Sequence, residues 1–282
     1  MSGPAANNHD LAAAVAEINR AAAAAALPSS ATPVLTTVGD AAASSATTTA
    51  QGPGNGRGAF IVLEGLDRSG KTTQVKLLET RLAEEGRAVH LMRFPDRTTP
   101  TGQIINQYLS SSTTLPDQSI HLLFTANRWE SAPTITSLLS QGTTIICDRY
   151  YYSGMVYSAA KDNPTLTLPW ARSPEVGLPR PDLVVFLDLN EEKAGERGGF
   201  GEERYETGEM QGRVRSLFWG LKEGVVEVGG EEVRFREESE DLVVVDAGGS
   251  VEEVADEIWG VVVPKVEEAR RGGMGAEVRR VS

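Results

Sequence analysis

The segment that most constrains this chain is residues 65–72, GLDRSGKT, which matches the pattern G-x-x-x-x-G-K-[ST] at every fixed position. It follows a short apolar run at 60–63 that predicts a buried strand, and it leads into a helical pattern over 71–85. Glycines at these places let the backbone curl so that amide N–H groups point at phosphate oxygens, and the start of a helix adds partial positive charge. The segment therefore predicts a strand, a phosphate-binding turn and a helix in direct succession.

Two side chains of this motif carry its chemistry. Lys71 supplies a cation to the β- and γ-phosphates of a nucleoside triphosphate, and Thr72 offers a hydroxyl to Mg²⁺. We expect Lys71 to be a surface-facing cation and not a core group. Asp148, which ends a later strand, is the acidic group expected near the metal. The sequence lacks the N-K-x-D motif by which regulatory GTPases read guanine, so the motif favours an enzyme that holds two anionic nucleotides together.

From residue 59 onward, short apolar runs alternate with longer helical patterns. Strands are expected at 60–63, 89–93, 144–147, 183–187 and 242–245, and helices at 71–85, 102–109, 118–139, 209–222 and 251–262. Continuous apolar runs are typical of strands that are covered on both faces, and the alternation indicates right-handed crossovers. The sequence therefore predicts an α/β fold with a central parallel five-stranded sheet flanked by helices.

Residues 1–58 differ from the rest of the chain, because Phe60 is the first aromatic residue. A segment rich in Ala, Ser, Thr and Gly cannot bury enough apolar surface to offset the entropy of ordering, so we expect a disordered tail whose removal through residue 57 is tolerated. Before Arg57 the tail holds one arginine, Arg20, and no lysine. This composition disfavours a mitochondrial transit peptide.

Charge and cysteine content exclude several classes of protein. The chain has 27 Lys and Arg against 39 Asp and Glu, a net charge of −12, so bulk charge does not attract it to nucleic acid or to an anionic membrane. Cys147 is the only cysteine, which excludes an intrachain disulfide and a multi-cysteine zinc site and fits a reducing compartment. No apolar run is long enough for an ordinary transmembrane helix. We therefore expect a cytoplasmic or nuclear location without nucleic-acid or membrane partners.

Three segments depart from the strand–helix alternation. Residues 195–208 contain several glycines together with Arg197, Arg204 and Tyr205, and we interpret them as a mobile loop. Residues 223–241 are acidic, with a turn at Gly229-Gly230 between two runs that predict a small hairpin. This insertion is expected to be a solvated surface feature, and an acidic docking site is the alternative. Residues 264–282 are polar and are expected to fray.

Three clusters offer arginines and aromatic rings beyond what a core needs. They are FPDR at 94–97, FTANRWE at 124–130, and DRY at 148–150 with Tyr157 further on. The first and third follow strands, and ligands of open parallel sheets bind outside the carboxyl ends of the strands. Phe124 and Arg128 are four residues apart on one helix, so they share a face from which a ring can stack on a base and a guanidinium can bond its edge. The clusters indicate a second binding region next to the phosphate loop.

Taken together, FIVLEGLDRSGK, FPDR, HLLFTANRWE, DRYYYSG and GFGEERYE resemble, in this order, the thymidylate kinase family, over residues 59–263. The resemblance implies the nucleoside monophosphate kinase form of the P-loop fold, with a mobile lid at about 195–208 and helices that build a homodimer. It implies transfer of the γ-phosphoryl of ATP to thymidine monophosphate, with Mg²⁺, as a step of dTTP synthesis. It weakens over the acidic insertion and does not extend into the tail.

The resemblance also implies roles for single residues. Arg97 and Arg149 would hold the acceptor phosphate, Phe124 would stack on thymine, and Arg128 would bond its edge. Asp67 would accept from the sugar 3′-hydroxyl, and Tyr157 and Tyr205 would wall the sugar and disfavour a 2′-hydroxyl. Phe94 belongs to the same acceptor set. The expected ATP-binding residues are Gly65, Leu66, Asp67, Arg68, Ser69, Gly70, Lys71, Thr72, Thr73 and Arg197.

Catalysis is expected to depend on Arg68, Lys71 and Arg149. Arg68 lies inside the phosphate loop, as in eukaryote-like members of the family, and the lid stretch GGFG at 198–201 has no arginine. Arg68 is therefore assigned to transition-state charge, with a lid arginine as the alternative. Two other functions stay open: a related kinase with another acceptor, such as a deoxynucleoside kinase using Asp148 or Glu64 as base, and a non-catalytic nucleotide-binding scaffold.

Overall fold

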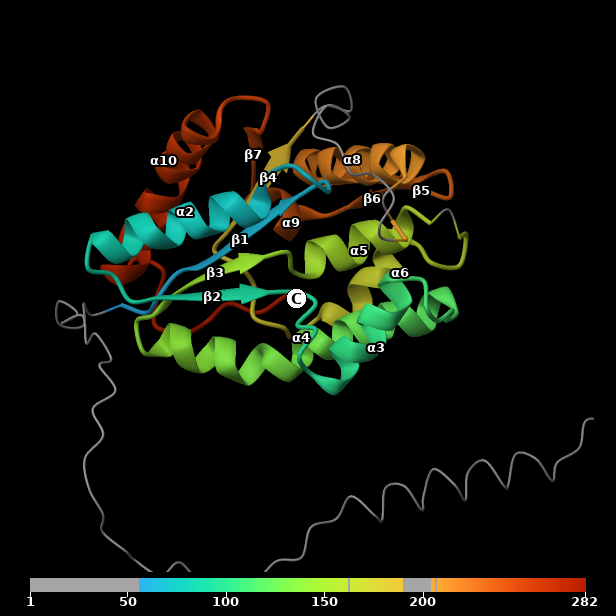
Figure 1. Cartoon of the computed structure of the whole chain (residues 1–282), viewed down its shortest axis with the longest axis horizontal. Coiled ribbons are helices and arrows are strands. Elements are labelled where there is room, and N and C mark those ends of the chain that lie inside the picture. The colour runs from blue at the N-terminus through green and yellow to red at the C-terminus, as the bar shows by residue number, and fades with distance from the viewer. Residues whose placement is uncertain (1–55, 162, 190–203, 206) are drawn as a thin grey trace, which may run out of the picture. The chain divides into compact units, whose positions relative to one another are not determined.

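The computed structural model describes residues 56–161, 163–189, 204–205 and 207–282 (Figure 1). The strands are β1 (Phe60–Gly65), β2 (Val89–Arg93), β3 (Thr144–Asp148), β4 (Leu183–Asp188), β5 (Val225–Val228), β6 (Glu231–Arg234) and β7 (Leu242–Asp246). The helices are α2 (Lys71–Glu84), α3 (Pro100–Leu109), α4 (Asp117–Ser140), α5 (Tyr151–Ala159), α6 (Leu168–Arg172), the 3₁₀ turn η1 (Ser173–Glu175), α8 (Gly208–Glu223), α9 (Arg236–Asp241) and α10 (Val251–Arg270).

The main sheet has five strands in the order β2-β3-β1-β4-β7, and every neighbouring pair is parallel. This confirms the predicted fold class and all five predicted strands. β1 lies in the centre, with Phe60 opposite Ile145 of β3 and Ile61 opposite Leu183 of β4. The loop after β1 therefore emerges in the middle of the carboxyl edge, flanked by the ends of β3 and β4.

Helices cover both faces of this sheet, which explains why its strands are continuous apolar runs. Successive side chains of a strand point to opposite faces, so Ile61 and Leu63 pack with Leu78 of α2 and Ile258 of α10. Phe60 and Val62 pack into the other cluster, which α4, α5 and α8 complete. Figure 1 shows α2 and α10 on one side of the sheet and α4 on the other.

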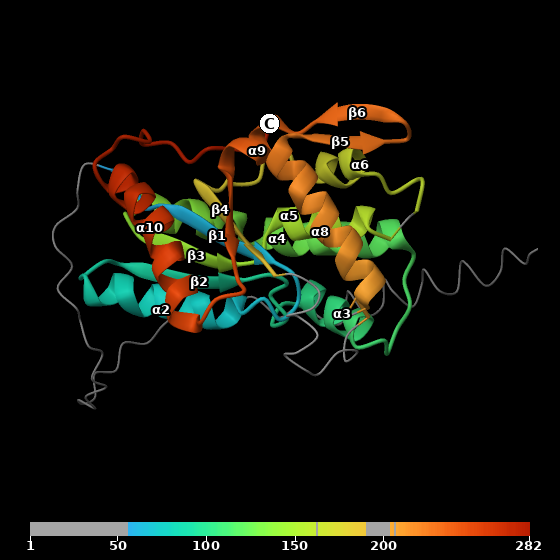
Figure 2. The same cartoon turned by 90° about the horizontal axis from the view of Figure 1, so that it is seen from above.

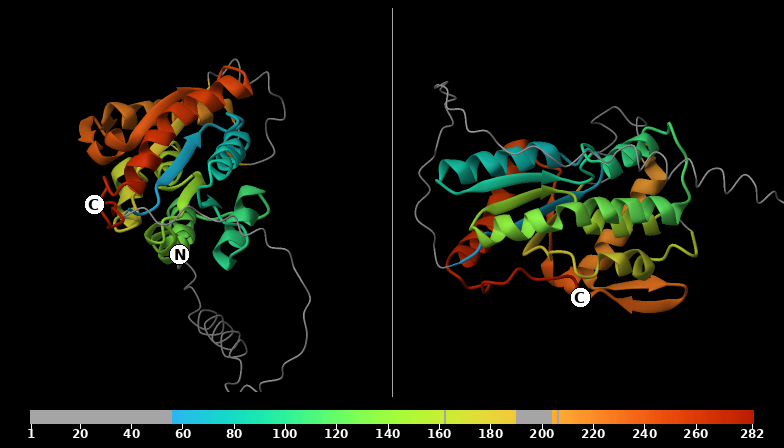
Figure 3. Two further views of the ribbon diagram at one scale, coloured as in Figure 1. Left: turned by 90° about the vertical axis from the view of Figure 1, so that its left-hand side faces the viewer. Right: turned by 90° about the horizontal axis from the view of Figure 1, so that it is seen from below.

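The chain's last residues pack on the domain, so the expectation that 264–282 frays is wrong. α10 continues through Pro264 to Arg270 because Val262, Val266 and Ala269 stay buried against the sheet. The segment after it returns to end beside α9 and the hairpin (Figures 2 and 3). There the Gly177 amide donates to the Val281 carbonyl at 2.8 Å, and Val281 itself is buried. Backbone pairing offsets the polar composition.

The start of the packed region also differs from its expected position. Arg57 is buried, and its guanidinium donates to both carboxylate oxygens of Asp182 at 2.6 and 2.7 Å. Packing therefore begins at least two residues before the expected Ala59, and removing residues through 57 would leave Asp182 without this partner. The other residues of the expected tail, up to 55, lie outside the described residues.

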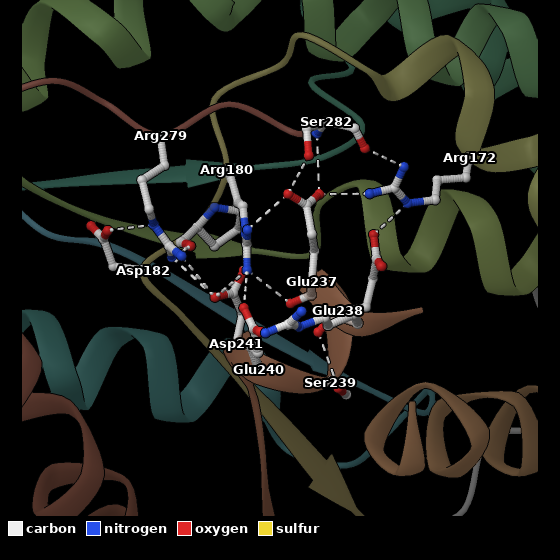
Figure 4. Close-up of polar contacts among 12 residues, drawn as sticks. Arg172, Arg180, Asp182, Glu237, Glu238, Ser239, Glu240, Asp241, Arg279 and Ser282 are labelled. Carbon is white, nitrogen blue, oxygen red and sulfur yellow. Dashed lines mark hydrogen bonds and ion pairs between the residues drawn. The ribbon is translucent and has the colours of Figure 1, made fainter. Parts of the chain in front are cut away.

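The acidic insertion forms the predicted hairpin, β5 paired antiparallel with β6, but it is not merely a solvated surface feature. In α9, which follows it, Glu238 and Asp241 are buried. Figure 4 shows their partners: Arg172 Nε donates to Glu238 at 2.7 Å, and Arg180 Nε donates to Asp241 at 2.6 Å. Ion pairs with arginines elsewhere in the chain thus tie this acidic segment to the domain.

Candidate active site

A cavity of about 420 Å³ opens at the carboxyl edge of the sheet, between the phosphate loop and the helices α4 and α5. α2 begins at Lys71, and Gly70 before it has φ 90°, a left-handed conformation that glycine adopts without steric cost. The adjacency of β1 and β3 brings Thr72 next to Asp148, with Oγ1 donating to Oδ2 at 3.1 Å. The predicted hydroxyl and carboxylate of the metal site are thus neighbours.

Lys71 is buried, so the expectation of a surface-facing cation is wrong. Its Nζ donates to the carbonyl oxygens of Gly65 at 3.1 Å and Leu66 at 2.5 Å, inside the turn that the motif forms. Burial, together with the smaller effect of the nearby Arg149 charge, lowers the pKa of Lys71 to about 7. The carbonyls of its own loop thus hold the ammonium group at the cavity wall.

Arg149 and Asp67 form the centre of a polar cluster beside the loop. Arg149 Nη2 donates to Asp67 Oδ1 at 2.5 Å, and Nη1 donates to the Gly65 carbonyl at 3.0 Å. Burial acts to raise the pKa of Asp67, but the charges of Arg149 and Lys71 hold that pKa below its usual value. Tyr157 also reaches this carboxylate, its hydroxyl donating to Oδ2 at 3.4 Å. The cluster brings Arg149 and Tyr157 to Asp67, which lies 82 and 90 residues before them in the sequence.

Gln211 of α8 belongs to the same cluster and was missed by the sequence reasoning. Its Nε2 donates to Asp67 Oδ2 at 2.9 Å, and its Oε1 accepts from the Asp67 amide at 3.1 Å. A glutamine in an amphipathic helix matches no motif, so only its packing against the phosphate loop identifies it. Gln211 fixes both the backbone and the carboxylate of Asp67.

The residues expected to bind the acceptor line the same cavity as the phosphate loop. Phe94, Arg97, Phe124, Arg128, Tyr157 and Tyr205 all line it, together with Arg149. The rings of Tyr157 and Tyr205 lie 5.7 Å apart at their centroids. Arg97 Nη1 donates to Asn106 Oδ1 at 2.7 Å. One continuous cavity therefore joins the predicted donor and acceptor regions.

Not every predicted residue reaches the cavity. Asp67, Arg68, Gly70, Lys71, Thr72 and Thr73 line it, whereas Gly65, Leu66 and Ser69 shape the loop behind it. Arg197 lies outside the described residues. Arg204 donates to the backbone carbonyls of Tyr108 and Thr113 at 3.2 and 3.0 Å, so it anchors the later part of the expected lid segment, 195–208, to the end of α3.

Glu64, one of the two conceivable bases of the alternative kinase, is fully engaged elsewhere. It is buried and accepts from the Tyr150 amide at 2.8 Å and from Ser153 Oγ at 2.5 Å. Burial raises its pKa. It does not line the cavity, so its role is to hold the start of α5 against β1.

Among the described residues, no group of three or more His, Cys, Asp or Glu side chains is arranged to hold a metal ion. A magnesium site built from one hydroxyl, one carboxylate and the oxygens of a bound nucleotide does not need such a group. No helix among the described residues is long and apolar enough to cross a membrane.

The comparisons with known proteins agree with this geometry. The thymidylate kinase family model matches residues 63–258. A thymidylate kinase of Danio rerio is 45% identical over 202 residues, covering 72% of this chain and 88% of that protein, and one of Schizosaccharomyces pombe is 46% identical over 206 residues, covering 73% and 92%. The solved thymidylate kinase of Candida albicans superposes with a TM-score of 0.65 at 35% identity, covering 81% of this chain and all of that one. By sequence and by fold, this chain belongs to the thymidylate kinase family.

Proposed function

We propose that this enzyme transfers the γ-phosphoryl group of ATP to the 5′-phosphate of thymidine monophosphate, forming thymidine diphosphate and ADP. The observation that carries this proposal is that one continuous cavity is lined both by the phosphate loop and by Phe124 and Arg128. A nucleoside triphosphate on the loop and a monophosphate against α4 would meet between Lys71 and Arg149.

Phosphoryl transfer depends on alignment and charge neutralisation more than on covalent help from the protein. An oxygen of the acceptor phosphate attacks the γ-phosphorus, the bond to the β–γ bridging oxygen breaks, and ADP leaves. The attacking oxygen is already deprotonated at neutral pH, so no general base is needed. Lys71, Arg68, Arg97 and Arg149 supply the local positive charge that an acidic chain requires here.

The residues at the loop fit a magnesium ion, because Thr72 Oγ1 and Asp148 Oδ2 are both hard oxygen donors and lie 3.1 Å apart. When bound, the ion neutralises charge on the triphosphate. Thr72 would hold the ion through its hydroxyl, and Asp148 would hold it through its carboxylate, directly or through water.

Base selection follows from the chemistry of Arg128, which can only donate hydrogen bonds. Thymine presents a 4-oxo acceptor where cytosine carries an amino donor, so a buried donor would face a donor in the cytidine nucleotide. Purines are too large for a slot sized for one ring on Phe124. Tyr157 and Tyr205 are proposed to disfavour a ribose 2′-hydroxyl.

A coupled assay that measures ADP formation by the full chain tests this function. With ATP and Mg²⁺, we expect thymidine monophosphate to give the highest kcat/KM, with deoxyuridine monophosphate about tenfold lower because it lacks one methyl. Cytidine and purine monophosphates should be far poorer. Arg128→Ala should narrow the thymine-to-cytosine ratio. Preference for a nucleoside would favour the deoxynucleoside kinase, and binding of ATP without turnover would favour the scaffold.

We also propose that two copies of this chain associate through α4. Leu122 and Trp129 are 47% and 40% exposed and lie two helical turns apart, and Val176, just after η1, is 47% exposed. The Trp129 indole donates to the Pro174 carbonyl of η1 at 3.0 Å, which places Trp129 beside the segment that contains Val176. Sedimentation should give a dimer for the wild type and a monomer for Leu122→Glu. A wild-type monomer would contradict this proposal.

A cytoplasmic or nuclear location remains a proposal. It is supported by the single, buried Cys147 and by the shortage of basic residues before Arg57. A fluorescent fusion of the full chain tests it, and accumulation in mitochondria would contradict it.

A further inference from the structure

Arg128, the proposed base-reading residue, is held by a carboxylate that no motif marked. The Arg128 side chain is 2% exposed and the Glu175 side chain 0%, which makes them a fully buried ion pair. Arg128 Nε donates to Glu175 Oε2 at 2.9 Å, and Nη2 donates to Oε1. Two parallel bonds of this kind fix the plane of a guanidinium as well as its position.

Two further groups hold the Arg128–Glu175 ion pair in place, and we call the whole arrangement the Arg128 clamp. Thr125 Oγ1 donates to Glu175 Oε1 at 2.6 Å and so holds the carboxylate from the preceding turn of α4. On the opposite side, Gly154 of α5 leaves room for the guanidinium, because a Cβ there would lie 2.6 Å from Nη2. The guanidinium is thus enclosed between the η1 carboxylate and the α5 backbone, with little freedom to rotate.

The clamp decides which edge of Arg128 is available to a ligand. Both bonds to Glu175 use the edge formed by Nε and Nη2, and among the described residues Nη1 donates to no protein acceptor. Arg128 and Gly154 both line the cavity, and the Gly154 Cβ position lies 3.1 Å from Nη1. Nη1 is therefore the donor left for a base in the slot next to Phe124.

We propose that Glu175 is a positioning residue that sets base selectivity by fixing the Nη1 edge of Arg128 toward the 4-oxo group of the base. This inference rests on the proposed function. An arginine free to rotate could turn aside and reach another acceptor when a cytosine amino group approaches. A clamped one cannot, so the mismatched donors stay opposed and discrimination stays high.

Glu175→Gln tests this in the full chain, because glutamine keeps the size but places an amide N–H against the guanidinium. We expect KM for thymidine monophosphate to rise about tenfold and the thymine-to-cytosine ratio of kcat/KM to fall by about tenfold or more. KM for ATP should stay within about twofold, since the clamp lies at the acceptor end. Glu175→Asp, which keeps the charge, should restore part of the ratio.

Glu238→Gln is the matched control. Glu238 is equally buried and pairs with Arg172 Nε at 2.7 Å, but it lies outside the active-site cavity. It should lower the melting temperature in the same way as Glu175→Gln while leaving the ratio unchanged. Thr125→Val removes one hydrogen bond to Glu175 while nearly keeping the shape of the side chain. It should lower the thymine-to-cytosine ratio of kcat/KM by less than Glu175→Gln does, and it replaces that variant as the test if Glu175→Gln does not fold.

Two results would overturn the inference. One is a thymine-to-cytosine ratio that Glu175→Gln, or Thr125→Val in its place, leaves within about twofold of wild type. The other is a double variant in which Glu175→Gln and Arg128→Ala lower the ratio independently, because a residue that acts through Arg128 adds nothing once Arg128 is gone. If wild type does not prefer thymidine monophosphate, the proposed function fails separately.

Discussion

Arg68 has a backbone conformation that glycine would adopt more easily. Its φ is 67°, in the left-handed region, where a residue with a Cβ is disfavoured by about 1–2 kcal/mol. Replacement by glycine removes this cost, but it also lowers the free energy of the unfolded chain by about 0.4–1 kcal/mol, because glycine gives that chain more conformational entropy. Arg68→Gly should therefore leave the free energy of unfolding close to that of wild type, because this backbone gain of up to about 1 kcal/mol is offset by the loss of the contacts that the Arg68 side chain makes.

The same substitution should be severe for catalysis. An arginine acting on transition-state charge contributes about 10³–10⁵ in rate in comparable reactions, or about 4–7 kcal/mol. We expect kcat to fall by that factor while KM for thymidine monophosphate changes by less than about fivefold, because the guanidinium acts on charge that develops in transfer. If Arg68 were merely structural, its replacement would lower the stability of the protein before it lowered kcat by such a factor.

The assay is steady-state ADP formation beside a thermal melt of the same preparation. Ser111→Gly is the control, since Ser111 also has a positive φ, 58°, and is exposed away from the cavity. It should give the same small change in melting temperature without loss of kcat. If Arg68→Gly keeps kcat within about tenfold while Arg197→Ala loses it, the reasoning is refuted and the catalytic charge belongs to the lid.

Three further outcomes are expected. Lys71→Ala should lower kcat/KM by about 10³ or more with an unchanged circular dichroism spectrum, because it removes the buried ammonium group from the phosphate loop; activity within about tenfold of wild type would contradict this role. Burial lowers the pKa of His121 from 6.5 to about 4, so the unfolded chain binds a proton at this histidine at a higher pH than the folded chain does. The stability that comes from the neutral, buried His121 is therefore fully present above pH 6.5 and is lost as the pH falls toward 4. Urea titrations should show that the free energy of unfolding falls by about 2 kcal/mol between pH 6.5 and 5 because of His121. The His121→Asn variant should not show this part of the pH dependence. Arg57→Met should lower the free energy of unfolding by about 3 kcal/mol or more, because Asp182 then loses its main buried partner; a melting temperature equal to wild type would show that Arg279, 3.5 Å from Asp182, suffices.

Local patterns were enough to predict the elements that build the site. The phosphate turn, the five strands of the main sheet and the five longest helices of the described residues each depend on residues within about one element's length, where periodicity and glycine placement act directly. The family resemblance ordered the same motifs along the chain. Tyr157 and Arg149 could therefore be assigned to the cavity before any contact was known.

Only the tertiary structure decided the partners of these residues. Gln211 meets Asp67 across 144 residues, Arg57 meets Asp182 across 125, and Glu175 meets Arg128 across 47. No periodicity relates such positions, because the strand order and the packing of the helices bring them together. Lys71 differs, because the carbonyls that hold its ammonium group belong to its own loop, at Gly65 and Leu66. Only the charges around it, those of Asp148 and Arg149 at the end of β3, come from a distant part of the sequence.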